Sequence, residues 1–376
     1  LVNEKTALCA PTGIAALNIG GVTCHSLFGL PVGLTSSNDA HKISNKFRQR
    51  FNRSSPIETI IIDEIGTLRA DYLDLIDLKL RNVREINEPW GGLQMVVVGD
   101  LFQLSPIVAR SEQQWFNREY SSAFPFAARS WDFHTIELDV IHRQTNPMHV
   151  QVLESIRRCD HEVNDAIYII TQMASKNHIP GSLRLCCYNR DADIVNSQEY
   201  QKIPGDEVTL WAQTRGDWGN DEPVPNCLRL RVGTRVLICA NGNGYVNGDR
   251  GYVEEITSES LRIRKDDGII VSVLPNDWEK HDYSQKDGNV KRQVVATFTQ
   301  FPIRHGWAVS IHKSQGMTLD GVTIDVGRGC FAHGQLYVAL SRCRDLERIN
   351  FVTQPSVTDV RVDRAVNEFY KQKANT

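Results

Sequence analysis

Two acidic residues at the end of an apolar run have the types and spacing to do chemistry. Asp63 and Glu64 directly follow the β-branched run Ile60-Ile61-Ile62. Such a run is typical of a buried parallel strand that delivers acids to the carboxyl edge of its sheet, where open α/β sheets bind ligands. An aspartate there can hold a magnesium ion on a nucleotide, and a following glutamate can orient or deprotonate a water. The alternative is a pair of solvated carboxylates at a strand end.

Three further polar residues have types that suit phosphate chemistry. Gln103 follows a second apolar run, 93–98, and could touch a γ-phosphate or its attacking water; the alternative is an ordinary loop residue. Arg143 could reach a bound nucleotide or form a surface salt bridge. Arg342 ends a largely apolar helix, and because a charge is seldom buried unpaired, it indicates a specific anion.

Two other segments carry residues that suit nucleic acid. The segment 10–16 (APTGIAA) is a strand–turn–helix connection, and helix N-termini can bind phosphates, although a simple connection is the alternative. His25 and Phe28 follow and could contact bases, but a core Phe is the commoner case. The segment 307–318 concentrates His, Lys, Ser, Gln and Thr, which suits backbone phosphates better than a core.

Alternating strand and helix patterns would position these residues, and they predict two α/β units with parallel sheets. Apolar residues at helical spacing also predict an amphipathic helix at 70–87. The expected strands of the first unit are 6–9, 59–63, 93–98 and 136–140. The second unit is expected to contain a strand at 183–187, a helix at 190–201, a strand at 322–326, a helix at 332–343 and a strand at 349–352.

The pattern changes between 228 and 303, where short strands alternate with turn dipeptides such as Asn247-Gly248. This predicts a small antiparallel barrel inserted into the second unit. The polar stretch 31–57 is expected to be a surface excursion rather than core.

The composition of the 376 residues is that of an ordinary globular protein, with 41% hydrophobic and 23% charged residues. A net charge of -3 predicts that any nucleic-acid site is a local groove rather than a basic tail. No apolar stretch approaches the ~18 residues of a membrane span, so no membrane contact is expected. The expected location is intracellular: cytoplasmic, nucleoid-associated, or nuclear or mitochondrial in a eukaryote. The nine cysteines are expected to be reduced thiols.

The order of the motifs APTGIAA, IIIDE, GDLFQL, HRQ, HKSQG and YVALSR resembles the motif series of superfamily 1 DNA helicases. The match is to the PIF/RecD-like group, which moves 5′ to 3′, and it extends from residue 7 to about 352. The segment 228–253 resembles the SH3-like insert of that group. The resemblance implies an α/β fold of two RecA-like domains, with ATP in the cleft between them and single-stranded or forked DNA across their top. It also implies work in DNA replication, repair or recombination.

The resemblance implies a role for each site residue. Asp63 and Glu64 would be the magnesium-binding and water-activating acids, and Gln103 would sense the γ-phosphate of ATP. Arg143 and Arg342 would be arginine fingers from the other side of the cleft.

Other matched positions are implied to bind nucleotide or DNA. Gln315 would couple the nucleotide to the DNA strand, and Gln144 would lie beside the nucleotide. The residues expected near DNA are Pro11, Thr12, His25, Phe28, His312, Lys313 and Thr318.

The phosphate-cradling sequence G-x-x-x-x-G-K-[S/T] of this family does not occur in the 376 residues. The first domain is therefore expected to be truncated at its N-terminus, with that loop encoded upstream and ATP hydrolysis by this fragment weak or absent. The alternative function is a single-stranded DNA-binding module that has lost its ATPase activity. The expected domain limits are 1–142 for the first RecA-like domain, 143–227 and 304–376 for the second, and 228–303 for the SH3-like insert.

Overall fold

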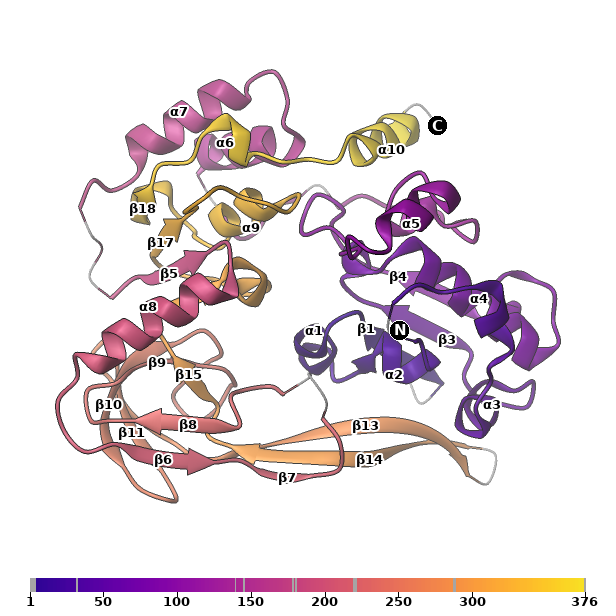
Figure 1. Ribbon diagram of the computed structural model, residues 1–376, viewed down its shortest axis with the longest axis horizontal. Coiled ribbons are helices and arrows are strands. Elements are labelled where there is room, and N and C mark those ends of the chain that lie inside the picture. Colours follow the sequence, from indigo (N-terminus) through magenta and orange to yellow (C-terminus); the bar gives the residue numbers. More distant parts are fainter. Residues whose placement is uncertain are drawn as a thin grey trace.

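We describe the protein from a computed structural model, over residues 5–374 except 32, 139, 145, 178, 180, 219–221, 287 and 288. Two parallel sheets with their helices lie side by side, and an antiparallel region lies beside both (Figure 1). This arrangement confirms the predicted α/β fold class with two parallel-sheet domains.

The first sheet is parallel and has the strand order β2-β1-β3-β4. Its central strand β3 pairs Ile60 with Ala7 of β1 and with Met95 of β4. Ile60 and Ile62 are fully buried, as the apolar run predicts for a strand between two neighbours. The strands are β1 (Thr6–Ala10), β2 (Val22–Thr23), β3 (Thr59–Ile62) and β4 (Gln94–Val97).

Several α-helices lie in the described residues of this first part of the chain. The predicted amphipathic helix is confirmed as α4, whose Leu73, Ile76 and Leu80 are fully buried in the first core. The helices are α1 (Gly13–Asn18), α2 (Cys24–Phe28), α3 (Asn45–Phe51), α4 (Ala70–Arg84) and α5 (Gln113–Glu119).

Two local predictions for this part of the chain are wrong. Residues 136–138 and 140 lie outside any strand, and Asp139 lies outside the described residues. Ile136 and Leu138 are 77% and 90% exposed, because no described strand pairs with them. The stretch 31–57 is not only a surface excursion, since it contains α3, whose Phe47 and Phe51 are buried in the first core.

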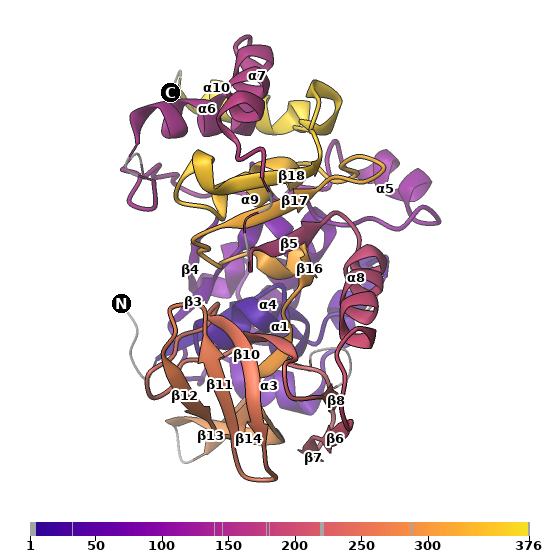
Figure 2. The ribbon, with the colours of Figure 1, turned by 90° about the vertical axis from the view of Figure 1, so that its left-hand side faces the viewer.

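The second sheet is also parallel, with the order β16-β5-β17-β18. Its core includes Leu185, Ile324 and Val338, all fully buried. Figure 2 shows α6 and α7 above this sheet and the antiparallel strands below it. The strands are β5 (Leu183–Cys186), β16 (Ala308–Ser310), β17 (Val322–Asp325) and β18 (Ile349–Thr353). The helices are α6 (Pro147–Arg158), α7 (Val163–Met173), α8 (Asn189–Gln201), α9 (Gln335–Ser341) and α10 (Arg364–Ala374).

The region between β8 and β15 is antiparallel, as predicted, with its own core around Leu230, Val236 and Ile263. Its largest sheet has the order β12-β11-β10-β9-β15, and the hairpin β13–β14 extends beneath the first domain to contact α3 (Figure 1). The SH3-like character of the insert and the four domain limits stay predictions. The strands are β6 (Val208–Trp211), β7 (Gln213–Arg215), β8 (Cys227–Leu230), β9 (Arg235–Ile238), β10 (Arg250–Ile256), β11 (Leu261–Lys265), β12 (Ile270–Val273), β13 (Asn276–Lys286), β14 (Asn289–Gln300) and β15 (Ile303–His305).

The two parallel-sheet domains touch where the loop after β4 meets α9 and α10. A Cβ on Gly334, at the start of α9, would lie 2.2 Å from the Gln103 carbonyl oxygen, so the backbones meet without room for a side chain. Tyr370 of α10 stacks on Phe102 with ring centroids 4.9 Å apart. The loop that carries Gln103 is therefore held by the second domain.

Candidate active site between the two sheets

Asp63 and Glu64 lie at the carboxyl end of β3, where the sequence places them. The backbone N–H of Asp63 still donates to Cys9 of β1 at 2.9 Å, so the ladder fixes the first acid. Glu64 turns sharply away with φ 51°, a left-handed conformation that is uncommon for a residue with a side chain. Its N–H donates to the Asp63 carboxylate at 2.9 Å, and the next N–H, of Ile65, donates to the Val98 carbonyl at 2.9 Å. The turn is thus anchored on both neighbouring strands.

Gln315 joins the two catalytic candidates of the first domain. Its amide nitrogen donates to the Glu64 carboxylate at 3.0 Å and to the side-chain oxygen of Gln103 at 3.3 Å. Gln315 directly follows a 3-10 helix, η5 (Ile311–Ser314), of the second domain. Glu64, Gln103 and Gln315 therefore contact one another between the two domains, and their expected roles toward the nucleotide stay predictions.

Arg342 approaches the same acids from the end of α9 and is only 2% exposed. Its guanidinium donates to the Val338 carbonyl and the Ser341 hydroxyl, each at 2.9 Å, and no carboxylate within the described chain forms a salt bridge with it. Burial and the neighbouring Arg143 lower the pKa of Arg342 to about 10, while the Glu64 carboxylate opposes this shift. Two cations close together in a desolvated place are stabilised by an anion between them.

Glu64 has the electrostatic setting of a proton acceptor. Burial and then the adjacent Asp63 raise the pKa of Glu64, whereas Arg342 and the Gln315 hydrogen bond lower it. A carboxylate with a raised pKa accepts a proton more readily near neutral pH than an ordinary one.

Gln144 contacts the carboxyl end of α9. Its side chain is buried, and its amide nitrogen donates to the carbonyls of Ser341 at 3.1 Å and Cys343 at 3.2 Å. Arg143 donates to the same Ser341 carbonyl at 3.3 Å. Gln144 therefore holds the end of α9, and so the position of Arg342, and its expected place beside the nucleotide stays a prediction.

Asp100 and Arg157, which brace the Gln103 loop, were not predicted as site residues from the sequence. Asp100 accepts from the Phe102 N–H at 3.0 Å and from the Gln103 side chain at 3.5 Å, and it pairs with Arg157 of α6 at 3.1 Å. The Arg157 guanidinium also lies 4.4 Å from the Phe102 ring centre. Asp100 could have been found from its place in GDLFQL, but Arg157 carries no local signal.

The residues expected near DNA divide into an accessible group and one buried residue. Thr12 is exposed and caps α1 by accepting from the Ala15 N–H, and Pro11 beside it is half-buried. His25 is half-buried, with its ring centroid 4.9 Å from that of Tyr72.

Phe28 is the buried one and is not available to stack on a base. It is 0% exposed and stacks on Phe51 of α3 with centroids 5.8 Å apart. The segment 31–57 folds over Phe28, so the core alternative is correct.

The second domain presents its three expected residues around η5. Lys313 and Thr318 are exposed, whereas His312 is half-buried and stacks on Phe331 at 5.8 Å. Burial lowers the pKa of His312, which favours its neutral form. A Cβ on Gly316 would lie 3.9 Å from the Asn18 amide of α1, so these residues are adjacent to the first domain's accessible group.

Within the part of the chain that the structure describes, every helix falls short of the length and apolar character needed to cross a membrane.

Known proteins with similar sequences are DNA helicases. The family profile described as PIF1-like helicase matches residues 2–164. The ATP-dependent DNA helicase PIF1 of Xenopus laevis is 32% identical over 98% of this chain and 58% of its own length. That of Bdellovibrio bacteriovorus is 30% identical over 98% of this chain and 82% of its own length. The chain spans less than two thirds of the vertebrate relatives that it matches.

Solved structures agree over nearly the whole chain. A crystal structure of Bacteroides sp. Pif1 in complex with ADP-AlF4 has a TM-score of 0.89, with 34% identity over 99% of this chain and 87% of that one. Bacteroides Pif1 bound to single-stranded DNA has a TM-score of 0.68 at 34% identity, over 99% of this chain and 88% of that one. The fold and the matches define a superfamily 1 helicase with RecA-like domains. The chain belongs to the PIF1-like helicase family.

Proposed function

We propose that this chain is the motor of an ATP-dependent DNA helicase that hydrolyses ATP between its two parallel-sheet domains and moves along single-stranded DNA. The observation that carries the proposal is the buried Arg342, which faces Glu64 from the opposite domain without a carboxylate partner among the described residues. The γ-phosphate of ATP is an anion of the size and charge that such a place requires. Named relatives of the family are ATP-dependent DNA helicases, which supports the same function.

The residues present fit a magnesium ion on the nucleotide. One oxygen of the Asp63 carboxylate accepts from the Glu64 N–H, and the other has no hydrogen-bond partner within the described chain. Magnesium on phosphates commonly takes one or two protein carboxylates and otherwise water and phosphate oxygens. When bound, magnesium neutralises charge on the phosphates, and Asp63 would hold it.

The protein groups around the phosphate have separate tasks. Glu64 orients a water and accepts its proton, and its raised pKa matches this task. Arg342 and Arg143 stabilise the negative charge that spreads over the transferred phosphoryl group. Gln315 touches both Glu64 and Gln103 and directly follows η5, so it links the phosphate site to the DNA-facing turn.

The DNA strand would follow the accessible residues Pro11, Thr12 and His25 on the first domain and His312, Lys313 and Thr318 on the second. These side chains supply hydroxyl, imidazole and ammonium groups, which suit contacts to phosphates that fix position without reading sequence. The proposed direction is 5′ to 3′, and the proposed location is a cell compartment that contains DNA.

The test measures ATP hydrolysis and strand separation by protein made from its complete gene. We expect single-stranded DNA to stimulate hydrolysis, and we expect a forked duplex with a 5′ tail to be unwound in preference to one with a 3′ tail. Binding of single strands without any stimulation of hydrolysis would instead support the alternative, a DNA-binding module without ATPase activity.

A further inference from the structure

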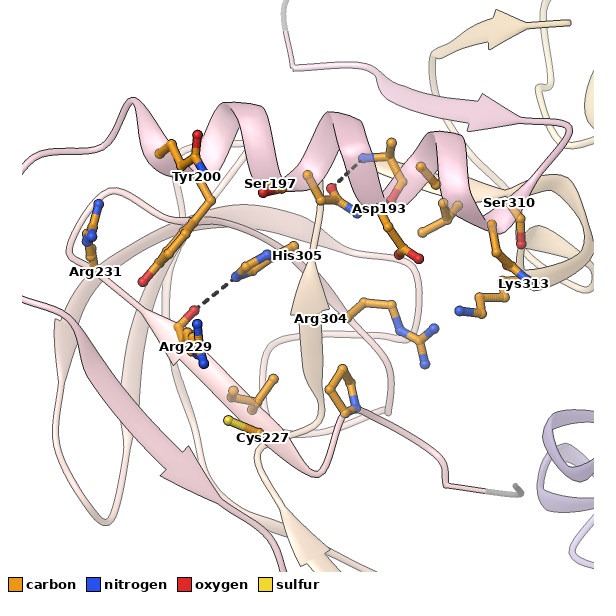
Figure 3. Close-up of a pocket in the computed structure, with 18 of the residues that line it drawn as sticks. Asp193, Ser197, Tyr200, Cys227, Arg229, Arg231, Arg304, His305, Ser310 and Lys313 are labelled. Atoms are coloured by element: carbon orange, nitrogen blue, oxygen red, sulfur yellow. Dashed lines mark hydrogen bonds between the residues drawn. The ribbon is translucent and has the colours of Figure 1, made fainter. Parts of the chain in front are cut away.

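A pocket of about 620 Å³ lies between α8 and the antiparallel region, outside the candidate active site (Figure 3). Its walls come from α8, β8, β15, β16 and η5. Four cationic side chains line it, against two acidic ones, Asp193 and Glu207; the four are Arg229, Arg231, Arg304 and Lys313.

The four cations differ in how their charges are compensated. Arg229 and Arg231 each lie 3.9 Å from a carboxylate oxygen of Glu207. Arg304 and Lys313 form no salt bridge with any described residue; Arg304 instead donates to the Pro223 carbonyl at 2.8 Å. One end of the pocket therefore carries two positive charges without a bound counter-charge.

Arg304 and Lys313 act on each other across this end of the pocket. Figure 3 shows both side chains directed toward the same space. Partial desolvation of the ammonium and then Arg304 lower the pKa of Lys313, and Asp193 on α8 opposes the shift. An anion held between the two cations would relieve this repulsion.

A buried hydroxyl at the same end also lacks a partner. Ser310 ends β16 and is 2% exposed, and its hydroxyl has no hydrogen-bond partner in the described structure. Buried side-chain polar atoms are hydrogen-bonded in the large majority of cases, so such a group calls for an explanation. Ser310 is one of the residues that line the pocket, and its buried hydroxyl is a free donor beside that space.

The aromatic rings of the pocket already contact other side chains of the protein. Tyr200 stacks on His305 at 4.9 Å, and the Arg231 guanidinium lies 4.9 Å from the Tyr200 ring centre. The Tyr200 hydroxyl donates to Glu207 at 3.0 Å. The pocket is therefore built for a phosphate group rather than for stacking of a base, which usually needs a free ring face.

We infer that this end of the pocket binds a backbone phosphate of the single strand, held by Arg304, Lys313 and the Ser310 hydroxyl. The inference rests on the proposed function and extends it, because Lys313 belongs to η5 and the strand path would continue from η5 beneath α8. The contact carries no sequence information, since it involves only the backbone.

The test is a salt titration of single-strand binding with oligonucleotides of increasing length. Arg304→Gln should lower the slope of log K against log salt by about 0.7, the share of one phosphate contact on a single strand, once the oligonucleotide is long enough to reach the pocket. Arg304→Lys should keep the slope. Ser310→Ala should weaken binding severalfold without changing the slope, because the hydroxyl is neutral. The matched control is Arg262→Gln, whose arginine is about half exposed and pairs with Glu255 on the insert.

The inference would be overturned if Arg304→Gln had the same slope of log K against log salt as the wild type and Arg262→Gln at every oligonucleotide length. If the wild type bound DNA normally in that experiment, the proposed function would stand and only the pocket contact would fail. A second arm measures thermal unfolding with inorganic phosphate at constant ionic strength. Stabilisation of the wild type but not of Arg304→Gln, together with unchanged DNA slopes, would assign the pocket to free phosphate and refute the DNA contact.

Discussion

Replacing Gly334 by alanine should separate the Gln103 loop from the second domain. Gly334 has φ 71°, and an added Cβ would lie 2.2 Å from the Gln103 carbonyl oxygen and 2.3 Å from that of Phe102. Ordinary contacts of a Cβ are 3.4–4 Å, so one backbone must move by more than an ångström. The left-handed backbone alone costs about 1–2 kcal/mol, and overpacking adds about 1–3 kcal/mol.

The matched control for this prediction is Gly20→Ala. Gly20 has φ 64°, but an added Cβ would meet nothing within 4 Å, so it isolates the backbone cost. Chemical denaturation should therefore show Gly334→Ala to be less stable than Gly20→Ala by about 1–3 kcal/mol.

The functional readout of Gly334→Ala is DNA-stimulated ATP hydrolysis. Because Gln103 and Gln315 touch at 3.3 Å, a displaced loop breaks their hydrogen bond. A barrier raised by about 1.4 kcal/mol slows turnover about tenfold, so a loss of at least that size is expected. Equal stability and equal turnover for the two alanine variants would refute the proposed contact.

Three further predictions concern single residues. Because the pKa of Glu64 is raised in the folded protein, Glu64→Gln should increase the free energy of unfolding measured in urea. The gain should be full at pH values above the pKa of Glu64 in the folded state, and it should vanish as pH falls below the pKa of a glutamate in the unfolded chain. A gain that grew toward acid pH would contradict the raised pKa. Phe28→Ala should cost about 3–5 kcal/mol of stability by calorimetry while the folded protein keeps its DNA affinity; lost affinity at unchanged stability would restore Phe28 as a DNA contact. Arg157→Met should lower the free energy of unfolding by about 1–3 kcal/mol. This is less than the ~3–5 kcal/mol lost when a fully buried ion pair is broken, because Arg157 and Asp100 are both partly exposed. An unchanged denaturation midpoint would show that the ion pair with Asp100 contributes nothing to stability.

The positions of Asp63 and Glu64 could be predicted from sequence because a local pattern places them at the end of a strand. A β-branched run such as Ile60–Ile62 forms a central strand, and its carboxyl end must lie at the sheet edge, so Asp63 and Glu64 follow from chain order alone. The burial of Arg342 beside a specific anion could be inferred for a similar reason, because a charged side chain at the end of an apolar helix is seldom buried without a partner of opposite charge.

Other features depend on contacts between distant segments, which no local pattern records. Phe28 is buried only because α3 folds over it, and the polar composition of 31–57 conceals that helix. The run at 136–140 has the alternation of a strand, but a strand also needs a neighbour, and none pairs with 136–138 among the described strands. Gln144 was placed by its motif, yet the carbonyl groups at the end of α9 hold its amide.

The pocket beneath α8 also depends on contacts between distant segments and could not be predicted from the sequence. Arg304 and Ser310 are separated by only six positions, but the uncompensated charge and the unpaired hydroxyl become visible only when α8 covers them. No spacing rule in the sequence predicts that these two groups lack protein partners.

The central claim is that Glu64 accepts the proton of the attacking water. The most direct test is Glu64→Gln in protein made from the complete gene, compared with Glu85→Gln, an exposed glutamate that also has positive φ, at 55°. We predict that DNA-stimulated ATP hydrolysis falls by about 10²–10⁴-fold in Glu64→Gln, with single-strand binding retained and Glu85→Gln at wild-type turnover. Wild-type turnover in Glu64→Gln would contradict the account.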